Sequence, residues 1–141
     1  MSEDEEINRL IGVRFEQRVK SVSVTQNRSM ETNTTYCEPF VVTDQNVEEV
    51  INSHEPVVLN FFADWCGPCK AMEPIISQLA AEYCGKVKFG KLNVGENPKT
   101  TSRFSVFSIP TFLLFKGGAV IERIVGAVPK KHIDKLISDL F

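Results

Sequence analysis

A pair of cysteines joins an apolar segment to a helical one, and this junction constrains the fold of the chain more than any other feature. Residues 57–63 are almost all apolar, as expected of a strand that is covered on both faces of a sheet. Cys66 and Cys69 follow closely, and a helical pattern then continues to about Tyr83. Two cysteines at this spacing, where a strand passes into a helix, form a dithiol that can close into a disulfide.

The helix that begins at Cys66 makes the two sulfurs unequal. Backbone N–H groups and the positive end of the helix dipole lie beside the first sulfur, where they stabilise a thiolate over a thiol. We therefore interpret Cys66 as the nucleophile and Cys69, one turn into the helix, as its resolving partner.

The same spacing is also found in half of a zinc site. A site with four ligands needs a second close pair, but Cys37 and Cys84 stand alone in the sequence, and His54 and His132 have no ligand spacing with them. We therefore predict no metal site. Cys37 and Cys84 are interpreted as spectator thiols, with a regulatory role as the alternative.

Charge and hydropathy argue against two classes of partner. The chain has 141 residues, of which 24% are charged, and its net charge of −2 gives no electrostatic reason to bind nucleic acid or an anionic membrane. Its longest apolar stretches have the length of strands, and its N-terminus is acidic where secretory and mitochondrial signals are basic. We expect a cytoplasmic monomer, which also fits four cysteines without the pattern of a disulfide framework.

The chain divides near residue 35. Residues 21–35 are polar and weakly periodic, and such a segment cannot bury enough apolar surface to offset the entropy of ordering. We interpret residues 1–35 as a flexible N-terminal extension and residues 36–141 as one domain. The alternative is a short amphipathic helix over residues 7–15 that docks on the domain.

From Phe40 onward, strand patterns alternate with helical ones. Strands are predicted for residues 40–42, 57–63, 87–94, 111–115 and 120–125, with helices around 47–51, 66–83 and 100–104 and after Pro129. Thr43 or Asp44 is predicted to cap the first helix, and Gly117-Gly118 predicts a hairpin. The order βαβαβαββα requires an α/β fold with a central mixed sheet and helices on both faces.

Several separated segments together resemble the thioredoxin family. They lie in register over residues 38–141 and are Phe61–Lys70 (FFADWCGPCK), Lys91–Asn93, Ile109–Thr111, Phe115–Gly117 and Val125–Ala127. The resemblance implies the thioredoxin fold and the reduction of disulfides in proteins. It also implies that Cys66 attacks the target disulfide, that Cys69 resolves the mixed disulfide, and that a thioredoxin reductase-like donor restores the dithiol. No bound cofactor follows from it.

The resemblance further assigns residues to a substrate surface. Pro110 matches the cis-proline of the family, whose geometry presents the backbone of Ile109 to an extended substrate. An ordinary proline at the start of a strand is the alternative. The other positions that match this surface around Cys66 are Trp65, Gly67, Pro68, Gly126 and Ala127.

One position departs from the family pattern. Asn60 stands six residues before Cys66, where the family usually has a buried Asp that helps to move the proton of the resolving thiol. An Asn side chain cannot accept that proton, and Lys91, which matches the lysine beside this Asp, lacks its carboxylate partner. We interpret Asn60 and Lys91 as the proton-transfer environment of Cys69. A satisfied core amide is the structural alternative for Asn60.

The leading hypothesis is therefore a protein-disulfide reductase that serves electron transport and cell redox homeostasis. An oxidase or isomerase of the same fold would use the same cysteines, but such relatives usually carry a histidine or another polar residue between them and are exported. Gly67 and Pro68, with the acidic N-terminus, argue against this alternative. The second alternative is a scaffold subunit that keeps its dithiol without catalysis.

Deletion of residues 1–35 should change thermal stability and insulin reduction little, because the folded pattern begins only near Phe40 and the removed segment carries no motif. Thermal unfolding of the full-length and truncated proteins tests this expectation. A large fall in melting temperature would contradict it and would indicate that Ile7, Leu10 and Phe15 dock on the domain.

Overall fold

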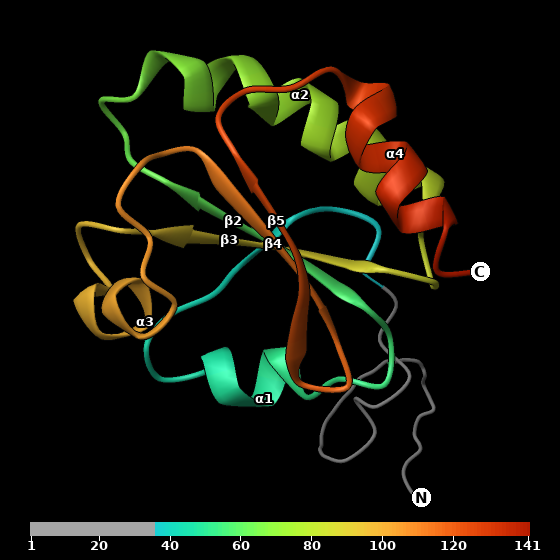
Figure 1. Ribbon diagram of the computed structural model, residues 1–141, viewed down its shortest axis with the longest axis horizontal. Helices are drawn as coiled ribbons and strands as arrows, with labels where there is room; N and C mark the ends of the chain where they lie inside the picture. The colour runs from blue at the N-terminus through green and yellow to red at the C-terminus, as the bar shows by residue number, and fades with distance from the viewer. Residues whose placement is uncertain (1–35) are drawn as a thin grey trace, which may run out of the picture. The chain divides into compact units, whose positions relative to one another are not determined.

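The structure is a computed structural model and describes residues 36–141 (Figure 1). Its elements are β1 (Phe40–Val41), α1 (Val47–Ile51), β2 (Val57–Phe62), α2 (Gly67–Glu82), β3 (Lys88–Asn93), α3 (Pro98–Arg103), β4 (Thr111–Lys116), β5 (Ala119–Val125) and α4 (Lys130–Ser138). The predicted order βαβαβαββα is confirmed. The N-terminal extension and its alternative, the docking helix, lie outside the described residues.

Within residues 36–141, five strands form one mixed sheet in the order β1-β3-β2-β4-β5. β3 pairs in parallel with β1 and with β2, whereas β4 is antiparallel to β2 and to β5. In Figure 1, α2 and α4 lie on one side of the sheet, and α1 and α3 lie on the other. The expected mixed sheet with helices on both faces is confirmed.

Alternate side chains of the central strand β2 enter two separate cores. One core joins Val58 to side chains of α2 and α4, namely Met72, Ile76, Leu79, Ala80, Ile133 and Ile137. The other joins the neighbouring β2 positions to α1 and contains Val57, Leu59, Phe61, Val47 and Ile51. Because both faces of β2 are covered, nearly every residue of the strand has to be apolar.

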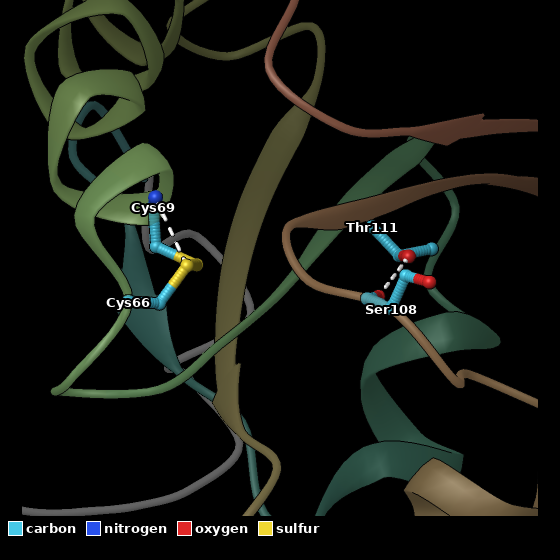
Figure 2. The surroundings of a disulfide bond; sticks show 4 residues. All are labelled: Cys66, Cys69, Ser108 and Thr111. Carbon is cyan, nitrogen blue, oxygen red and sulfur yellow. Dashed lines mark hydrogen bonds between the residues drawn. A yellow bond between two sulfur atoms is a disulfide. The ribbon is translucent and has the colours of Figure 1, made fainter.

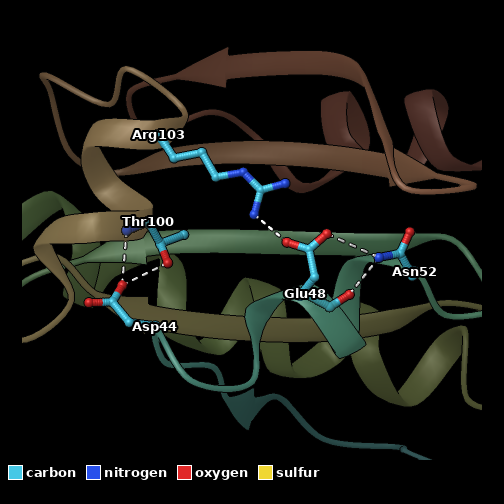
Figure 3. A network of polar contacts seen from close by, with 5 residues as sticks. All are labelled: Asp44, Glu48, Asn52, Thr100 and Arg103. Atoms are coloured by element: carbon cyan, nitrogen blue, oxygen red, sulfur yellow. Dashed lines mark hydrogen bonds and ion pairs between the residues drawn. The ribbon is translucent and has the colours of Figure 1, made fainter.

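The predicted cap of α1 is wrong, because Asp44 reaches a different helix. The N-cap position of α1 is Asn46, whose side-chain oxygen accepts a hydrogen bond from the N–H of Thr43 (2.8 Å). Asp44 instead accepts hydrogen bonds from the N–H (2.9 Å) and the hydroxyl (2.7 Å) of Thr100 in α3, as Figure 3 shows. Burial acts to raise the pKa of Asp44, but the hydrogen bonds from Thr100 and Lys99 outweigh it and lower that pKa.

A second carboxylate joins the same two helices. Glu48 of α1 pairs with Arg103 of α3 (2.5 Å) and accepts a hydrogen bond from the side chain of Asn52 (3.3 Å), as Figure 3 shows. The hydrogen bond and the positive charge of Arg103 lower the pKa of Glu48. Because α1 has five residues and α3 has six, neither forms a long helix, and these side-chain links help to hold them on the sheet.

The predicted turn at Gly117-Gly118 is confirmed. Lys116 pairs with Ala119 across the hairpin, so the two glycines alone make the turn. Their φ angles of 62° and 84° lie in the left-handed region, as a two-residue turn of this kind requires.

Cys37 and Cys84 do not stand alone in the fold, because the two sulfurs are bonded to each other. Their Cα atoms are 4.5 Å apart, although the sequence separation is 47 residues. The cause is the sheet topology. β1 pairs in parallel with β3, so the residues just before β1 lie beside those just before β3. The expectation that Cys37 and Cys84 are separate thiols is therefore wrong.

Candidate active site

The Cys66/Cys69 pair lies where β2 passes into α2. β2 ends at Phe62, and Cys66 occupies the N-cap of α2 with an extended backbone. Pro68 stands in the first turn of this helix, where its missing N–H removes no helical hydrogen bond. The two sulfurs are bonded, and the N–H of Cys69 donates a hydrogen bond to Cys66 Sγ (3.2 Å), as Figure 2 shows. The predicted dithiol is therefore assembled at a helix N-terminus.

Little of either cysteine is exposed. Cys66 is 4% exposed and Cys69 is 2% exposed. Both belong to a small apolar cluster with Ala63, against which Phe62 and Ile109 pack. A disulfide that reacts with this pair must therefore approach across the residues that surround Cys66.

The Ile109–Pro110 peptide bond is cis, as the resemblance implied. It lies immediately before β4, and β4 pairs with β2, the strand that leads to the cysteines. The hydroxyl of Thr111 donates a hydrogen bond to the carbonyl of Ser108 (2.6 Å) and closes the loop that carries Ile109 (Figure 2). The pairing of β4 with β2 explains why Ile109 comes to lie against the cysteine cluster.

Gly126 lies beside Pro110. Its N–H donates a hydrogen bond to the carbonyl of Pro110 (2.8 Å), and Ala127 follows it in the chain. Gly126 has a φ of 97°, which favours glycine, and apart from its chain neighbours no residue has an atom within 4 Å of the point where a Cβ would be. The backbone next to the cis-proline therefore faces open space.

Two large aromatic side chains are exposed near these residues. Trp65, directly before Cys66, is 80% exposed and is therefore not part of the core. Phe107, two residues before Ile109, is 92% exposed. Phe107 was not among the residues predicted from the sequence. The sequence did contain an indication of its exposure. Phe107 is an aromatic residue between the α3 segment and Ile109-Pro110, where no strand or helix was predicted to bury it.

Asn60 and Lys91 meet at a cavity beside α2. They are register partners in the parallel strands β2 and β3. Asn60 is 5% exposed, and its Oδ1 accepts no hydrogen bond from any residue of the described domain. The cavity has a volume of about 210 Å³ and is lined by Asn60, Lys91, Glu38, Pro39, Glu73, Ile76 and Ser77. No protein group of residues 36–141 therefore satisfies the carbonyl oxygen of Asn60.

Glu73 is a second residue that the sequence analysis missed. It follows Cys69 by four residues on α2, and this spacing places two helical residues on the same face. Both Glu73 and Glu38 line the cavity that contains Asn60. The i, i+4 spacing from Cys69 could have indicated Glu73 from the sequence. Glu38 lines the cavity only because of where β1 packs in the sheet, which the sequence spacing does not show.

Two kinds of feature are absent from residues 36–141. They contain no group of three or more histidine, cysteine, aspartate or glutamate side chains placed to hold a metal ion. None of the helices in this range has both the length and the apolar character needed to cross a membrane.

Comparison with known proteins agrees with this geometry. The family model described as Thioredoxin matches residues 38–139. The chain belongs to the thioredoxin family. The thioredoxin of Alicyclobacillus acidocaldarius is 42% identical over 101 residues, which make up 72% of this chain and 96% of that protein. Thioredoxin 2 of Chlorobaculum tepidum is 46% identical over 101 residues, or 71% of this chain and 93% of that protein.

Solved structures of thioredoxins share the fold. A mutant thioredoxin from Halobacterium salinarum NRC-1 aligns with a TM-score of 0.71 at 30% sequence identity. The alignment covers 76% of this chain and 94% of that chain. As a member of the thioredoxin family with a Cys66–Cys69 disulfide, the chain is a thiol-disulfide oxidoreductase of the protein-disulfide reductase type. The leading hypothesis from the sequence is confirmed at this level.

Asn60→Asp should accelerate resolution of a mixed disulfide roughly tenfold or more above the pKa of the new carboxyl group, since a carboxylate at the cavity supplies a general base. Burial raises the pKa of such a group, so the folded protein binds its proton more tightly than the unfolded chain does. The loss of stability is therefore absent below the unfolded-state pKa and develops as the pH rises through the folded-state pKa. Its size is about 1.4 kcal/mol for each tenfold difference in proton affinity, and Lys91 offsets part of it.

Single-turnover kinetics across pH, beside denaturant unfolding at the same pH values, measure both effects. Asn60→Leu is the matched control, because it keeps the approximate size of the side chain without a carboxyl group. Resolution that is equally fast in wild type and Asn60→Asp at every pH would contradict this role for position 60.

Proposed function

We propose that the chain carries electrons from a thioredoxin reductase-like donor to disulfides in proteins, as a cytoplasmic monomer. The observation that carries this proposal is the Cys66–Cys69 disulfide at the N-terminus of α2, beside the cis-proline loop and the exposed Trp65. The chemistry uses the two cysteine sulfurs alone, in keeping with a family that needs no bound cofactor. Residues 1–35 are proposed as an accessory extension that the reaction does not require.

The first step is attack by Cys66. Its thiolate attacks one sulfur of the target disulfide, forms a mixed disulfide and expels the other target sulfur as a thiolate. The N-cap position supports this role, because the helix dipole and the N–H of Cys69 both stabilise negative charge on Cys66 Sγ. Cys66 is the N-cap and Cys69 lies within the first turn behind it, which supports Cys66 as the sulfur that meets the target.

The second step is resolution by Cys69. Its thiolate attacks Cys66 Sγ, closes the Cys66–Cys69 disulfide and expels the second target sulfur, so that two electrons have passed to the target. The proton of the Cys69 thiol must leave before this attack. We propose that it leaves toward the cavity lined by Asn60 and Lys91, whose volume of about 210 Å³ leaves room for water. The donor then reduces the disulfide by the same exchange in reverse.

The proposed substrate surface surrounds Cys66. It consists of Trp65, Gly67, Pro68, Ile109, Pro110, Gly126 and Ala127, to which the exposure of Phe107 adds an eighth residue. Ile109 precedes β4 and lies outside its ladders with β2 and β5, so its backbone is placed to pair with an extended segment. The open space at Gly126 supports the close approach of such a segment.

Cys66→Ser should reduce insulin reduction to the uncatalysed rate, because the nucleophile is lost, whereas Cys69→Ser should attack and then stall as a mixed disulfide. Turnover measurements and mass spectrometry of the trapped species test the two roles. Cys37→Ser and Cys84→Ser are matched controls, and we expect nearly full turnover from both. Full activity of Cys66→Ser would contradict the mechanism and favour a scaffold.

Phe107→Ser should raise KM for a protein disulfide several-fold and leave kcat nearly unchanged, because the side chain offers apolar contact to the target without touching the reacting sulfurs. Reduction of a low-molecular-weight disulfide should not change. Phe141→Ser is the matched control, since Phe141 is also exposed (68%) but lies at the C-terminus of the chain. Figure 1 shows the C-terminus beside the C-terminal end of α2, the end opposite Cys66. Equal KM values for both variants and the wild type would remove Phe107 from the substrate surface.

A further inference from the structure

The described domain contains a second pair of bonded cysteines, away from Cys66. The Cα atoms of Cys37 and Cys84 are 4.5 Å apart, within the range that a disulfide spans. Cys37 is exposed and Cys84 is half-exposed, so small thiols and disulfides can reach the pair from solvent. In this respect it differs from the Cys66/Cys69 pair, which is almost completely buried.

The length of α2 separates the two pairs. Cys66 is the N-cap of this helix, and Cys84 follows its C-cap, Tyr83. The helix has 16 residues, so at a rise of 1.5 Å per residue the two ends lie about 24 Å apart. A continuous helix cannot fold back on itself, and the two pairs of one molecule therefore cannot exchange disulfides directly.

The two ends of the second pair are held unequally. Tyr83, next to Cys84, donates a hydrogen bond from its hydroxyl to the carboxylate of Asp134, which fixes the end of α2 to α4. Cys37 precedes β1, a strand of two residues at the edge of the sheet with β3 as its neighbour. The bond to Cys84 thus adds a covalent restraint to the start of the described domain.

We propose that Cys37 and Cys84 are a second, reversible redox couple that fastens the start of the domain to the end of α2. We further propose, as a part that rests on the proposed function, that Cys66 and Cys69 of another copy of this chain reduce its disulfide. The Cys66/Cys69 pair that reduces it must belong to another copy, because α2 keeps the two pairs of one molecule apart.

Oxidation of the couple needs a low-molecular-weight disulfide as the electron acceptor. The thiolate of one cysteine attacks this disulfide, forms a mixed disulfide and expels one small thiolate. The second cysteine then attacks the mixed sulfur of its partner, closes the Cys37–Cys84 bond and expels the second small thiolate. Two cysteine thiols are oxidised, one small disulfide becomes two thiols, and the two cysteine protons pass to the expelled thiolates.

The bond also has a structural consequence at the cavity beside α2. Glu38 and Pro39 follow Cys37 directly and line that cavity with Asn60 and Lys91. When the bond opens, β1 and the contacts of Tyr36 still hold this segment. The ring of Tyr36 lies 4.5 Å from the ring of Phe40, and the ammonium group of Lys88 lies 5.1 Å from the centre of the Tyr36 ring. The redox state of the second pair therefore bears on a wall of the cavity that contains Asn60.

The first experiment isolates the second couple in the full-length Cys66→Ser/Cys69→Ser variant. After equilibration with mixtures of reduced and oxidised glutathione, mass spectrometry should show one reversible transition in which two thiols are lost together. The oxidised form should melt on the order of 10 °C higher than the reduced form, because the bond closes a long loop of the unfolded chain. With Cys84→Ser added as the control, Cys37 should carry glutathione and the melting shift should disappear.

Two results would overturn the couple. One is stable glutathione on both cysteines, or disulfide-linked dimers, in place of an internal bond. The other is an oxidised form that melts at the same temperature as the reduced form, since the bond would then fasten nothing.

The second experiment tests reduction by another copy. A pre-reduced full-length Cys37→Ser/Cys84→Ser protein, which has only the active-site pair, is mixed with the oxidised Cys66→Ser/Cys69→Ser protein. Thiols should appear at Cys37 and Cys84 while the Cys66–Cys69 disulfide forms in the donor, at a rate that rises with donor concentration.

Insulin reduction by the same donor separates the two proposals. A donor that reduces insulin but not the Cys37–Cys84 bond would overturn reduction by another copy and leave the proposed function intact. A donor that reduces neither would overturn the proposed function, whereas the glutathione titration would still decide whether the couple exists.

Discussion

The fold and the site both depend on β2 being covered on its two faces. The strand pairs with β3 on one side and β4 on the other. Its side chains alternate between two cores, one that packs against α2 and α4 and one that packs against α1. This position fixes the point at which the strand ends and α2 begins, which is where Cys66 lies. It also brings the Ile109–Pro110 bond to the cysteines, because that bond starts the strand next to β2. Without the buried strand, neither the helix N-terminus nor the cis-proline loop would have a fixed place.

Asn60 is the polar exception in this buried strand. A carboxylate at this depth would lower stability whenever it was ionised, and a side-chain amide avoids that cost while it keeps a polar group at the cavity. No protein group of residues 36–141 donates a hydrogen bond to the carbonyl oxygen of Asn60. The neighbouring Glu38 and Glu73 add acidic residues to the same cavity from exposed positions, where an ionised group costs little. The chain thus has acidic groups at this cavity without a charge inside the strand.

The sequence predicted most of the features that depend on local pattern. Strand and helix order followed from the spacing of apolar residues, and the dithiol followed from the position of Cys66 and Cys69 between a strand and a helix. The features that it missed depend on neighbours distant in the chain. Asp44 accepts hydrogen bonds from α3 because α1 and α3 share a face of the sheet, and Cys37 meets Cys84 because β1 pairs with β3. The role of Lys91 and the roles of the substrate-surface residues around Cys66 stay predictions, since their positions are known but their functions are not tested.

α2 gives the chain two sulfur pairs in different physical settings. At its N-terminus, the helix dipole and the N–H of Cys69 favour a thiolate at Cys66 Sγ. This sulfur is nearly buried, and a protein target reaches it across an apolar surface. Beyond its C-terminus, Cys84 has no such stabilisation and meets a cysteine from an exposed edge of the sheet. Because a rigid helix separates the pairs, electrons pass between them only when two molecules collide, and that exchange is second order in protein. The state of the edge pair therefore depends on the concentration of reduced copies and on the small thiols and disulfides in solution, whereas the state of the Cys66–Cys69 pair depends on the donor and the targets.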